Sequence, residues 1–130
     1  MKFIKLIKSN KISHRNGKIY VFQKSKKIKF NFQRVFVVKS NLNQIRGRHA
    51  HKKCIQLLSC LNGKIKIFCE SKSGKKKNFI LDNPEKFLII PKMTWSIQKY
   101  LKKNSILMVI CSRNFSEKDY IRDYAKFKKF

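Results

Sequence analysis

Short strand-like segments recur about every ten residues along most of the chain, and this pattern constrains the fold more than any other feature. The segments alternate apolar and polar residues or concentrate β-branched and aromatic ones, as half-buried strands do. They comprise residues 18–22, 30–38, 54–58, 64–69, 78–81, 87–90, 95–100 and 106–111. Asn-Gly, Ser-Gly and Asn-Pro dipeptides lie between several of them and favour turns. The pattern predicts an all-β fold, either a sandwich or a barrel.

One helix is expected, at the C-terminal end, from Ser116 to about Phe127. Ser116 and Asp119, three residues later, fit a capping box at its start. Four apolar or aromatic residues then share one helical face: Tyr120, Ile121, Tyr124 and Phe127. We expect this face to pack against the strands.

The chain has 130 residues, of which 42% are hydrophobic, which is enough for a single domain, residues 1–130, with a substantial core. The longest apolar runs, residues 87–90 and 106–111, are far shorter than the ~18 residues that a membrane span needs. Lysines interrupt the apolar residues of the N-terminal segment, which therefore lacks the continuous apolar stretch of a secretory signal. We expect no membrane association and a cytoplasmic location.

The chain carries 33 Lys and Arg against 6 Asp and Glu, which gives a net charge of +27 at pH 7. Such a charge suggests an anionic partner, and one hypothesis is a lysine-rich anion- or nucleic-acid-binding module without catalysis. However, Lys, Ile, Asn and Phe, whose codons are rich in A and T, occupy 64 of the 130 positions. The lysines are scattered and form no patch interleaved with aromatic residues. The composition therefore disfavours nucleic-acid recognition. It indicates that most of the positive charge reflects codon usage and not a binding function.

Residues 46–51, Arg-Gly-Arg-His-Ala-His, form the densest cluster of catalytic residue types. On a strand, His49 and His51 lie on the same face, because successive side chains alternate. Free imidazoles, with an unperturbed pKa of ~6.5, suit proton transfer near neutral pH. The third histidine, His14, is isolated among polar residues, and we expect it at the surface.

The spacing of His49-x-His51, Gln56, Gly63 and the later Ser96 resembles the cupin signature. In metal-binding cupins the position of Gln56 is Glu and that of Ser96 is a third His. Gln is a poor ligand and Ser a rare one, so only two good nitrogen donors remain. The four cysteines show no C-x-x-C spacing and are expected to be reduced thiols of the core. We therefore expect no metal and no other cofactor.

Six segments, spread over nearly the whole chain, carry a closer resemblance. They are Arg34-Val35-Phe36, residues 46–52, Gln56, residues 81–84, residues 90–95 and the ending that starts with Asp119-Tyr120-Ile121-Arg122. Together they resemble the sugar nucleotide 3,4-ketoisomerases, the WxcM-like or FdtA-like cupins, which act on dTDP-4-keto-6-deoxyglucose. The R-G-x-H-A-H block and the D-Y-I-R ending are specific in combination.

The resemblance implies a cupin-type double-stranded β-helix (jelly roll) that binds no metal and forms a homodimer, often with exchange of an N-terminal strand. It implies an isomerase that converts dTDP-4-keto-6-deoxyglucose to a dTDP-3-keto-6-deoxyhexose. The product typically supplies an aminotransferase in the synthesis of 3-amino-3,6-dideoxyhexoses for surface polysaccharide, such as the O-antigen of lipopolysaccharide. A related cupin sugar epimerase is the alternative, because the histidine pair suits either reaction.

The implied chemistry needs one group that exchanges a proton with carbon and another that exchanges a proton with oxygen. A neutral histidine removes the C3 proton, which the neighbouring C4 carbonyl acidifies, and an enediolate forms. We assign His49 to carbon and His51 to proton shuttling, although the sequence leaves open which histidine does which. Arg46 is the candidate that stabilises the enediolate.

Five further residues are candidates for substrate binding. Arg15 and Arg34 suit the diphosphate, because a guanidinium binds phosphate oxygens in a bidentate manner. Gln56 either bonds a sugar hydroxyl or holds a catalytic histidine in one tautomer. Trp95 either stacks on the substrate or fills the core. Ser96, which follows Trp95 in the chain, is the fifth candidate for substrate binding.

The chain departs from the family pattern at two places. The family often has Tyr where Phe36 or Val37 stands, and His where Ser96 stands. These changes remove two polar groups from the expected pocket. If either group is essential to reprotonation, the chain is slow, protonates another face of C4, or is inactive.

Overall fold

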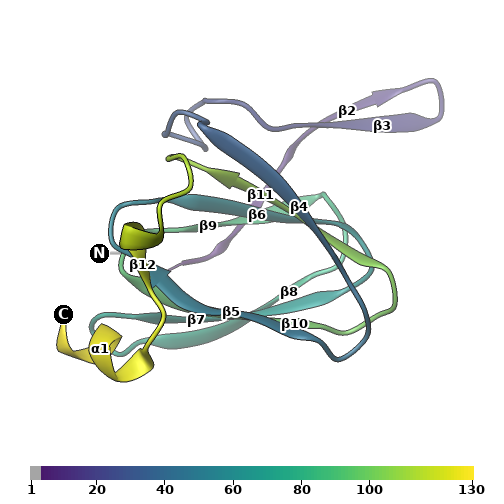
Figure 1. Ribbon diagram of the computed structural model, residues 1–130. Helices are drawn as coiled ribbons and strands as arrows, with labels where there is room; N and C mark the ends of the chain where they lie inside the picture. Colours follow the sequence, from purple (N-terminus) through teal and green to yellow (C-terminus); the bar gives the residue numbers. More distant parts are fainter. Residues whose placement is uncertain (1–3) are drawn as a thin grey trace.

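The computed structural model describes residues 4–130 and has two five-stranded sheets that face each other (Figure 1). The first sheet has the order β1-β9-β6-β11-β4, and the second has the order β12-β5-β10-β7-β8; all neighbours are antiparallel. The strands of the first sheet are β1 (Leu6–Lys8), β9 (Lys86–Ile90), β6 (Gln56–Asn62), β11 (Ser105–Cys111) and β4 (Arg34–Ser40). Those of the second are β12 (Tyr120–Ile121), β5 (Ile45–His51), β10 (Thr94–Tyr100), β7 (Ile65–Ser71) and β8 (Lys76–Leu81). The all-β sandwich predicted from strand spacing is confirmed.

Inward-facing side chains from alternate strand positions fill the space between the sheets. On β7, Ile65, Ile67 and Cys69 are fully buried, as the period of two requires. Leu58 and Leu107, from the first sheet, pack into the same core. All four cysteines are buried and free, so they serve as small core residues.

Residues 22–33 cover the outer face of the first sheet. An apolar cluster forms there: Ile28, Phe30, Leu57, Phe87 and Ile110. The sequence predicted a strand over residues 30–38, but β4 begins only at Arg34. Residues 30–33 pack their aromatic side chains against the sheet instead of adding a longer strand to its edge.

A separate hairpin, β2 (Asn10–His14) and β3 (Gly17–Val21), extends away from the sandwich (Figure 1). Arg15 and Asn16 form its tip with positive φ angles of 46° and 63°, as in a type I′ turn. Ile12 and Ile19 are paired across the hairpin, and both are about half exposed. This apolar pair therefore faces solvent in the single chain described over residues 4–130.

The C-terminal segment differs from the helix predicted over residues 116–127. It forms a 3-10 turn, η1 (Glu117–Asp119), then strand β12, and only then helix α1 (Tyr124–Lys129). Ser116 makes no side-chain cap bond, whereas the Asp123 carboxylate accepts from the N–H of Lys126 and caps α1. Both the predicted start and the capping box were therefore wrong, although a short helix does end the chain.

The physical reason lies in long-range hydrogen bonds. Asp119 accepts from the backbone N–H groups of Lys53 and Cys54, and the N–H of Lys52 donates to its carbonyl. These bonds hold the segment against β5 as a strand. The predicted packing of the helix is confirmed, because Phe127 of α1 is buried against Trp95. Among residues 4–130, no helix is long and apolar enough to cross a membrane.

Candidate active site

A bulge in β5 decides which side chains of the arginine and histidine segment face the interior. Arg48 is inserted between the residues that pair with Ser96 and its neighbour on β10. Gly47 and Arg48 have positive φ angles of 87° and 58°. A Cβ on Gly47 would lie 3.0 Å from the Ser96 carbonyl oxygen, so glycine is required. In a regular strand Arg46 and His49 would face opposite sides, and the bulge brings them to one side.

The interior face of the second sheet consequently carries a row of polar side chains. His49 lies opposite Ser96, and Arg46 lies opposite Gln98. Ser96 and Gln98 are buried, whereas Arg46 is exposed. The Tyr100 hydroxyl donates to Gln98 Oε1 at 2.8 Å. The row therefore runs from an exposed cation to a half-buried imidazole.

His51 follows on the same face, with its ring centroid 5.0 Å from that of His49 in an edge-to-face contact. Its Nδ1 lies 2.9 Å from Oδ2 of Asp119. Burial would raise the pKa of Asp119, but the bonds from His51 and from two backbone amides lower it. Because the ionised carboxylate only accepts, it places a proton on Nδ1 of His51. Nε2 of His51 is buried and has no hydrogen-bond partner within residues 4–130.

Tyr120 of β12 lies against both imidazoles. It pairs with His51 across the strands, and its ring centroid is 4.3 Å from that of His51 and 5.1 Å from that of His49. The Arg122 guanidinium lies 4.1 Å from the Tyr120 ring centroid. Glu117 accepts from Nε and Nη2 of Arg122 at 2.6 and 3.0 Å. The tyrosine ring is thus fixed between an arginine and two histidines.

Arg34 of β4 reaches the same place from the first sheet. Its guanidinium lies 5.3 Å from the Phe36 ring centroid and 5.6 Å from that of Phe115, and it donates to Cys111 Sγ at 3.4 Å. Burial would lower the pKa of Arg34, but the neighbouring Tyr120 hydroxyl and Cys111 thiol raise it. A permanent cation therefore lies beside the Tyr120 hydroxyl.

The two histidines differ in their electrostatic surroundings. Burial, and then the repulsion between two protonated imidazoles, lower the pKa of His49 to about 4. His49 is therefore neutral at pH 7 and has a free lone pair. His51 has a carboxylate partner, and His49 has none of comparable strength within the described residues. The pair consists of one neutral base and one oriented ring.

Two predicted residues do not join the histidines. Arg15 is at the tip of the projecting hairpin. Trp95 alternates with Ser96 and faces outward, where it packs against Tyr124 and Phe127 of α1. Gln56 is buried and donates to Cys111 Sγ at 3.5 Å, the same sulfur to which Arg34 donates. The orientation of His51, one of two roles considered for Gln56, is instead provided by Asp119.

One group of metal-ligand residue types occurs within residues 4–130. His51, Cys54 and Asp119 offer donor atoms within 4.8 Å of one another. These donors already bond within the protein: Asp119 accepts from His51 and from the backbone N–H of Cys54, and the Cys54 thiol donates to the Ile55 carbonyl. The group also omits His49. Its chemistry fits a hydrogen-bonded carboxylate and imidazole better than a metal centre.

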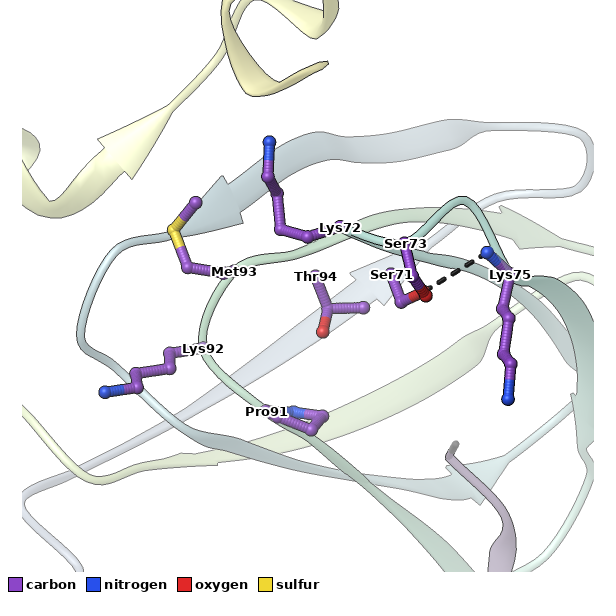
Figure 2. Close-up of a pocket in the computed structure, with 8 residues that line it drawn as sticks. All are labelled: Ser71, Lys72, Ser73, Lys75, Pro91, Lys92, Met93 and Thr94. Carbon is purple, nitrogen blue, oxygen red and sulfur yellow. Dashed lines mark hydrogen bonds between the residues drawn. The ribbon is translucent and has the colours of Figure 1, made fainter. Parts of the chain in front are cut away.

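A cavity of about 600 Å³ opens where β7 ends and β10 begins (Figure 2). Residues 71–73, 75 and 91–94 line it, three of them lysines. Met93 in this lining donates its backbone N–H to the His51 carbonyl at 2.6 Å. Neither histidine side chain lines the cavity, so we place the candidate active site on the interior face of β5.

Comparison with known proteins places this site in a family. Residues 2–130 match the model of the family described as FdtA, WxcM-like, C-terminal. The chain belongs to this family. The predicted resemblance to the WxcM-like or FdtA-like cupins is therefore confirmed, and the relatives below, which are sugar nucleotide 3,4-ketoisomerases, confirm the isomerase class.

Relatives of this FdtA-family chain match along nearly its whole length. The TDP-4-oxo-6-deoxy-alpha-D-glucose-3,4-oxoisomerase of Aneurinibacillus thermoaerophilus is 32% identical over 127 residues, 97% of this chain and 91% of that protein. WlaRB, a TDP-quinovose 3,4-ketoisomerase from Campylobacter jejuni, has 26% identity and a TM-score of 0.92 over all of both chains. A variant of the 3,4-ketoisomerase QdtA from Thermoanaerobacterium thermosaccharolyticum, in complex with TDP-4-keto-6-deoxyglucose, has 29% identity and a TM-score of 0.89 over 97% of this chain and 91% of that one. These matches confirm the cupin-type fold.

Sequence reasoning missed two residues of the site in this FdtA-family chain. Asp119 was assigned to a helix cap, and Tyr120 to an apolar helix face. The signal that pointed to them was the D-Y-I-R ending, a distinctive motif with no role in the predicted pocket. A helix cap does not require tyrosine or arginine, so the motif itself indicated another function.

Proposed function

We propose that the chain converts dTDP-4-keto-6-deoxyglucose to a dTDP-3-keto-6-deoxyhexose by metal-independent proton transfer. One observation carries the proposal: His49 and His51 project from one strand face, and a partly buried carboxylate orients one of them. Two imidazoles with different partners suit a reaction that moves one proton between carbons and one between oxygens. The activities of the named relatives support the same substrate class.

His49 is the base at carbon in this proposal. The C4 carbonyl acidifies the C3 proton, and a neutral imidazole removes it to give an enediolate. Because its pKa is lowered to about 4, His49 is in the basic form over the whole neutral range. The same ring then delivers a proton to C4.

His51 exchanges protons with the sugar oxygens. Asp119 keeps a proton on Nδ1, so Nε2 is the acceptor. Nε2 has no protein partner among the described residues, which leaves its lone pair available to a hydroxyl of the substrate. Asp119 is thus a positioning residue that acts through His51.

The two arginines of the site are proposed to take roles opposite to those assigned from sequence. Arg34 lies partly buried beside Tyr120, where a cation stabilises charge that develops on the reacting oxygens. Arg46 is exposed on the same face as His49, where it suits the more solvated diphosphate. Ser96, opposite His49, is a candidate contact to the sugar.

We further propose a homodimer in which the projecting hairpin contacts a second copy. Ile12 and Ile19 are exposed on the hairpin, and Val35 and Val37 are each 57% exposed on β4, the terminal strand of its sheet. Exposed apolar surface of this kind is typical of interfaces between subunits. Exchange of the hairpin would also carry Arg15 to the partner subunit, where it is a candidate for the diphosphate.

Light scattering coupled to size-exclusion chromatography tests the dimer. We expect twice the chain mass of 15.6 kDa for the native protein, and monomer for Ile12→Lys combined with Ile19→Lys. Replacement of Lys11 and Lys18, on the neighbouring positions of the same hairpin, by Gln is the matched control and preserves the dimer. A monomeric native protein contradicts the proposal.

Incubation of the purified protein with dTDP-4-keto-6-deoxyglucose in D2O, followed by NMR, tests the activity. We expect a 3-keto product and deuterium exchange at C3. His49→Asn should lower the rate by about 10³-fold or more without unfolding the protein. An intact fold with neither exchange nor product contradicts the proposal, and exchange with an unmoved ketone indicates an epimerase instead.

The product fits the synthesis of 3-amino-3,6-dideoxyhexoses for surface polysaccharide, because a 3-keto sugar is the substrate that an aminotransferase requires. We propose this place in metabolism together with a cytoplasmic location. We expect an amino sugar when a pyridoxal-phosphate aminotransferase specific for dTDP-3-keto sugars is added to the reaction. Failure to form the amino sugar contradicts the proposed place in metabolism.

A further inference from the structure

The proposed reaction leaves one proton without a named donor. When the C3 proton leaves, the electron pair of the C4 carbonyl moves onto O4, which must be protonated to become the new hydroxyl. Two hydroxyl-bearing side chains of the described residues lie next to the imidazoles, Ser96 opposite His49 and Tyr120 against both rings. Ser96 is 3% exposed in the middle of the sheet, whereas Tyr120 is only partly buried. Tyr120 is therefore the more accessible donor.

Charged and aromatic groups surround Tyr120. The Arg34 guanidinium neighbours its hydroxyl, and both side chains pack against Phe115. Arg122, held by two bonds to Glu117, lies 4.1 Å from the ring centroid and fixes the ring. The ring also contacts His51, whose centroid is 4.3 Å away, so the two groups are neighbours in the site.

We propose that the Tyr120 hydroxyl protonates O4 of the sugar and is itself reprotonated from His51. The inference rests on the proposed function and adds a catalytic residue to it. His49 takes the C3 proton, the C3–C4 double bond forms, and O4 takes the phenolic proton, which leaves a phenolate beside Arg34. The O3 proton then passes to Nε2 of His51 as the C3 carbonyl forms, and C4 takes the proton held by His49. Transfer from His51 to the phenolate restores every group, so no oxidant or reductant is needed.

Tyr120→Phe tests the inference because it keeps the aromatic ring and removes only the hydroxyl. We expect product formation to fall about 10²-fold, while dTDP affinity stays unchanged and C3 deuterium exchange, which depends on His49, falls much less. Tyr124→Phe is the matched control, since it removes a phenol that bonds to Glu70 away from the histidines. This control should isomerise at the native rate.

Three outcomes overturn the inference. Tyr120→Phe that forms product at the native rate shows that its hydroxyl is not needed. An equal loss of exchange and product in a folded Tyr120→Phe variant assigns the residue to the placement of His49. Loss of product in Ser96→Ala, with Tyr120→Phe active, identifies the serine as the donor. Absence of exchange and product in the native protein is a different result, because it contradicts the proposed function itself.

Discussion

Two carboxylates, one buried and one partly buried, hold the C-terminal segment to the sandwich, and they differ in what they bind. Glu70 of β7 is 1% exposed and accepts from the Tyr124 hydroxyl, at 2.9 Å to each oxygen, and from Lys128 Nζ at 2.8 Å. Asp119 accepts from His51 and from two backbone amides. The whole chain has only six acidic residues, and these two hold the C-terminal segment to the strands.

The two carboxylates differ in whether the side chain bonded to them has a further reactive atom. Tyr124 and Lys128 donate to Glu70 and take part in no proposed chemistry. Their bonds attach helix α1 to strand β7. The imidazole that bonds to Asp119 has another nitrogen, which is buried and has no partner among residues 4–130. The same short contact is therefore an anchor at one position and orients a reactive group at the other.

Of the variants at the two carboxylates, Asp119→Asn should have the larger effect on activity and separate the two positions most clearly. An amide that turns its NH2 toward His51 favours the tautomer with the proton on Nε2, so the acceptor is lost. We expect kcat/KM for the isomerisation to fall about 10²–10³-fold, as measured by NMR. Thermal unfolding monitored by circular dichroism should change modestly, because the amide oxygen still accepts from the Lys53 N–H, although the NH2 no longer accepts from the Cys54 N–H. Native activity would remove Asp119 from the mechanism.

Glu70→Gln should produce the reverse pattern. Loss of the charge weakens the buried bonds to Tyr124 and Lys128, and we expect the free energy of unfolding to fall by about 1–2 kcal/mol. Urea titration measures this change. The kcat/KM should stay within about twofold of the native value, because Glu70 contacts neither histidine. A large loss of activity in this variant would show that the two positions are coupled.

The pH profile of activity tests the role of His49, the uncharged base of the histidine pair. Since the pKa of His49 is lowered to about 4, kcat/KM should stay high well below pH 6.5 and decline only near pH 4. The unfolded chain protonates this histidine near its ordinary pKa of ~6.5, whereas the folded chain resists protonation down to about 4. His49 therefore makes stability fall as the pH drops from about 6.5 to 4. Deuterium exchange at C3, the step assigned to His49, should follow the same profile, and a decline of this exchange centred near pH 6.5 contradicts the assignment of His49 as base.

Trp95→Phe should have the smallest effect on catalysis. The indole packs against Tyr124 and Phe127 on the outer face, so its reduction in size leaves a small void there. We expect a modest loss of thermal stability and a KM within about twofold of the native value. A large rise in KM would restore the stacking role that the sequence suggested.

The fold was predictable where local pattern and burial agree. The segments predicted at residues 64–69, 95–100 and 106–111 correspond to β7, β10 and β11, because their alternate side chains fill the core. Residues 116–123 were misassigned, since helical spacing of apolar residues was outweighed by bonds from Asp119 to residues more than 60 positions away. No local pattern contains such contacts.

The site, like the fold, was predictable from the sequence only in part. The shared face of His49 and His51 followed from the period of two along a strand. The joint orientation of Arg46 required the bulge at Gly47, which appears only when β5 pairs with β10. Asp119 and Tyr120 come to His51 through β12, a two-residue strand too short to be recognised from sequence.

The bulge in β5 also has a consequence for how the site can change. A strand sorts its residues by odd and even position, and one inserted residue inverts that parity for everything on one side of it. Loss of Arg48 would make the pairing regular, with His49 still opposite Ser96 and Arg46 still opposite Gln98. Regular pairing with Arg48 retained would instead turn Arg46 to the outer face. The orientation of the arginine therefore depends on whether Arg48 is accommodated as a bulge, while the histidines keep theirs in either case.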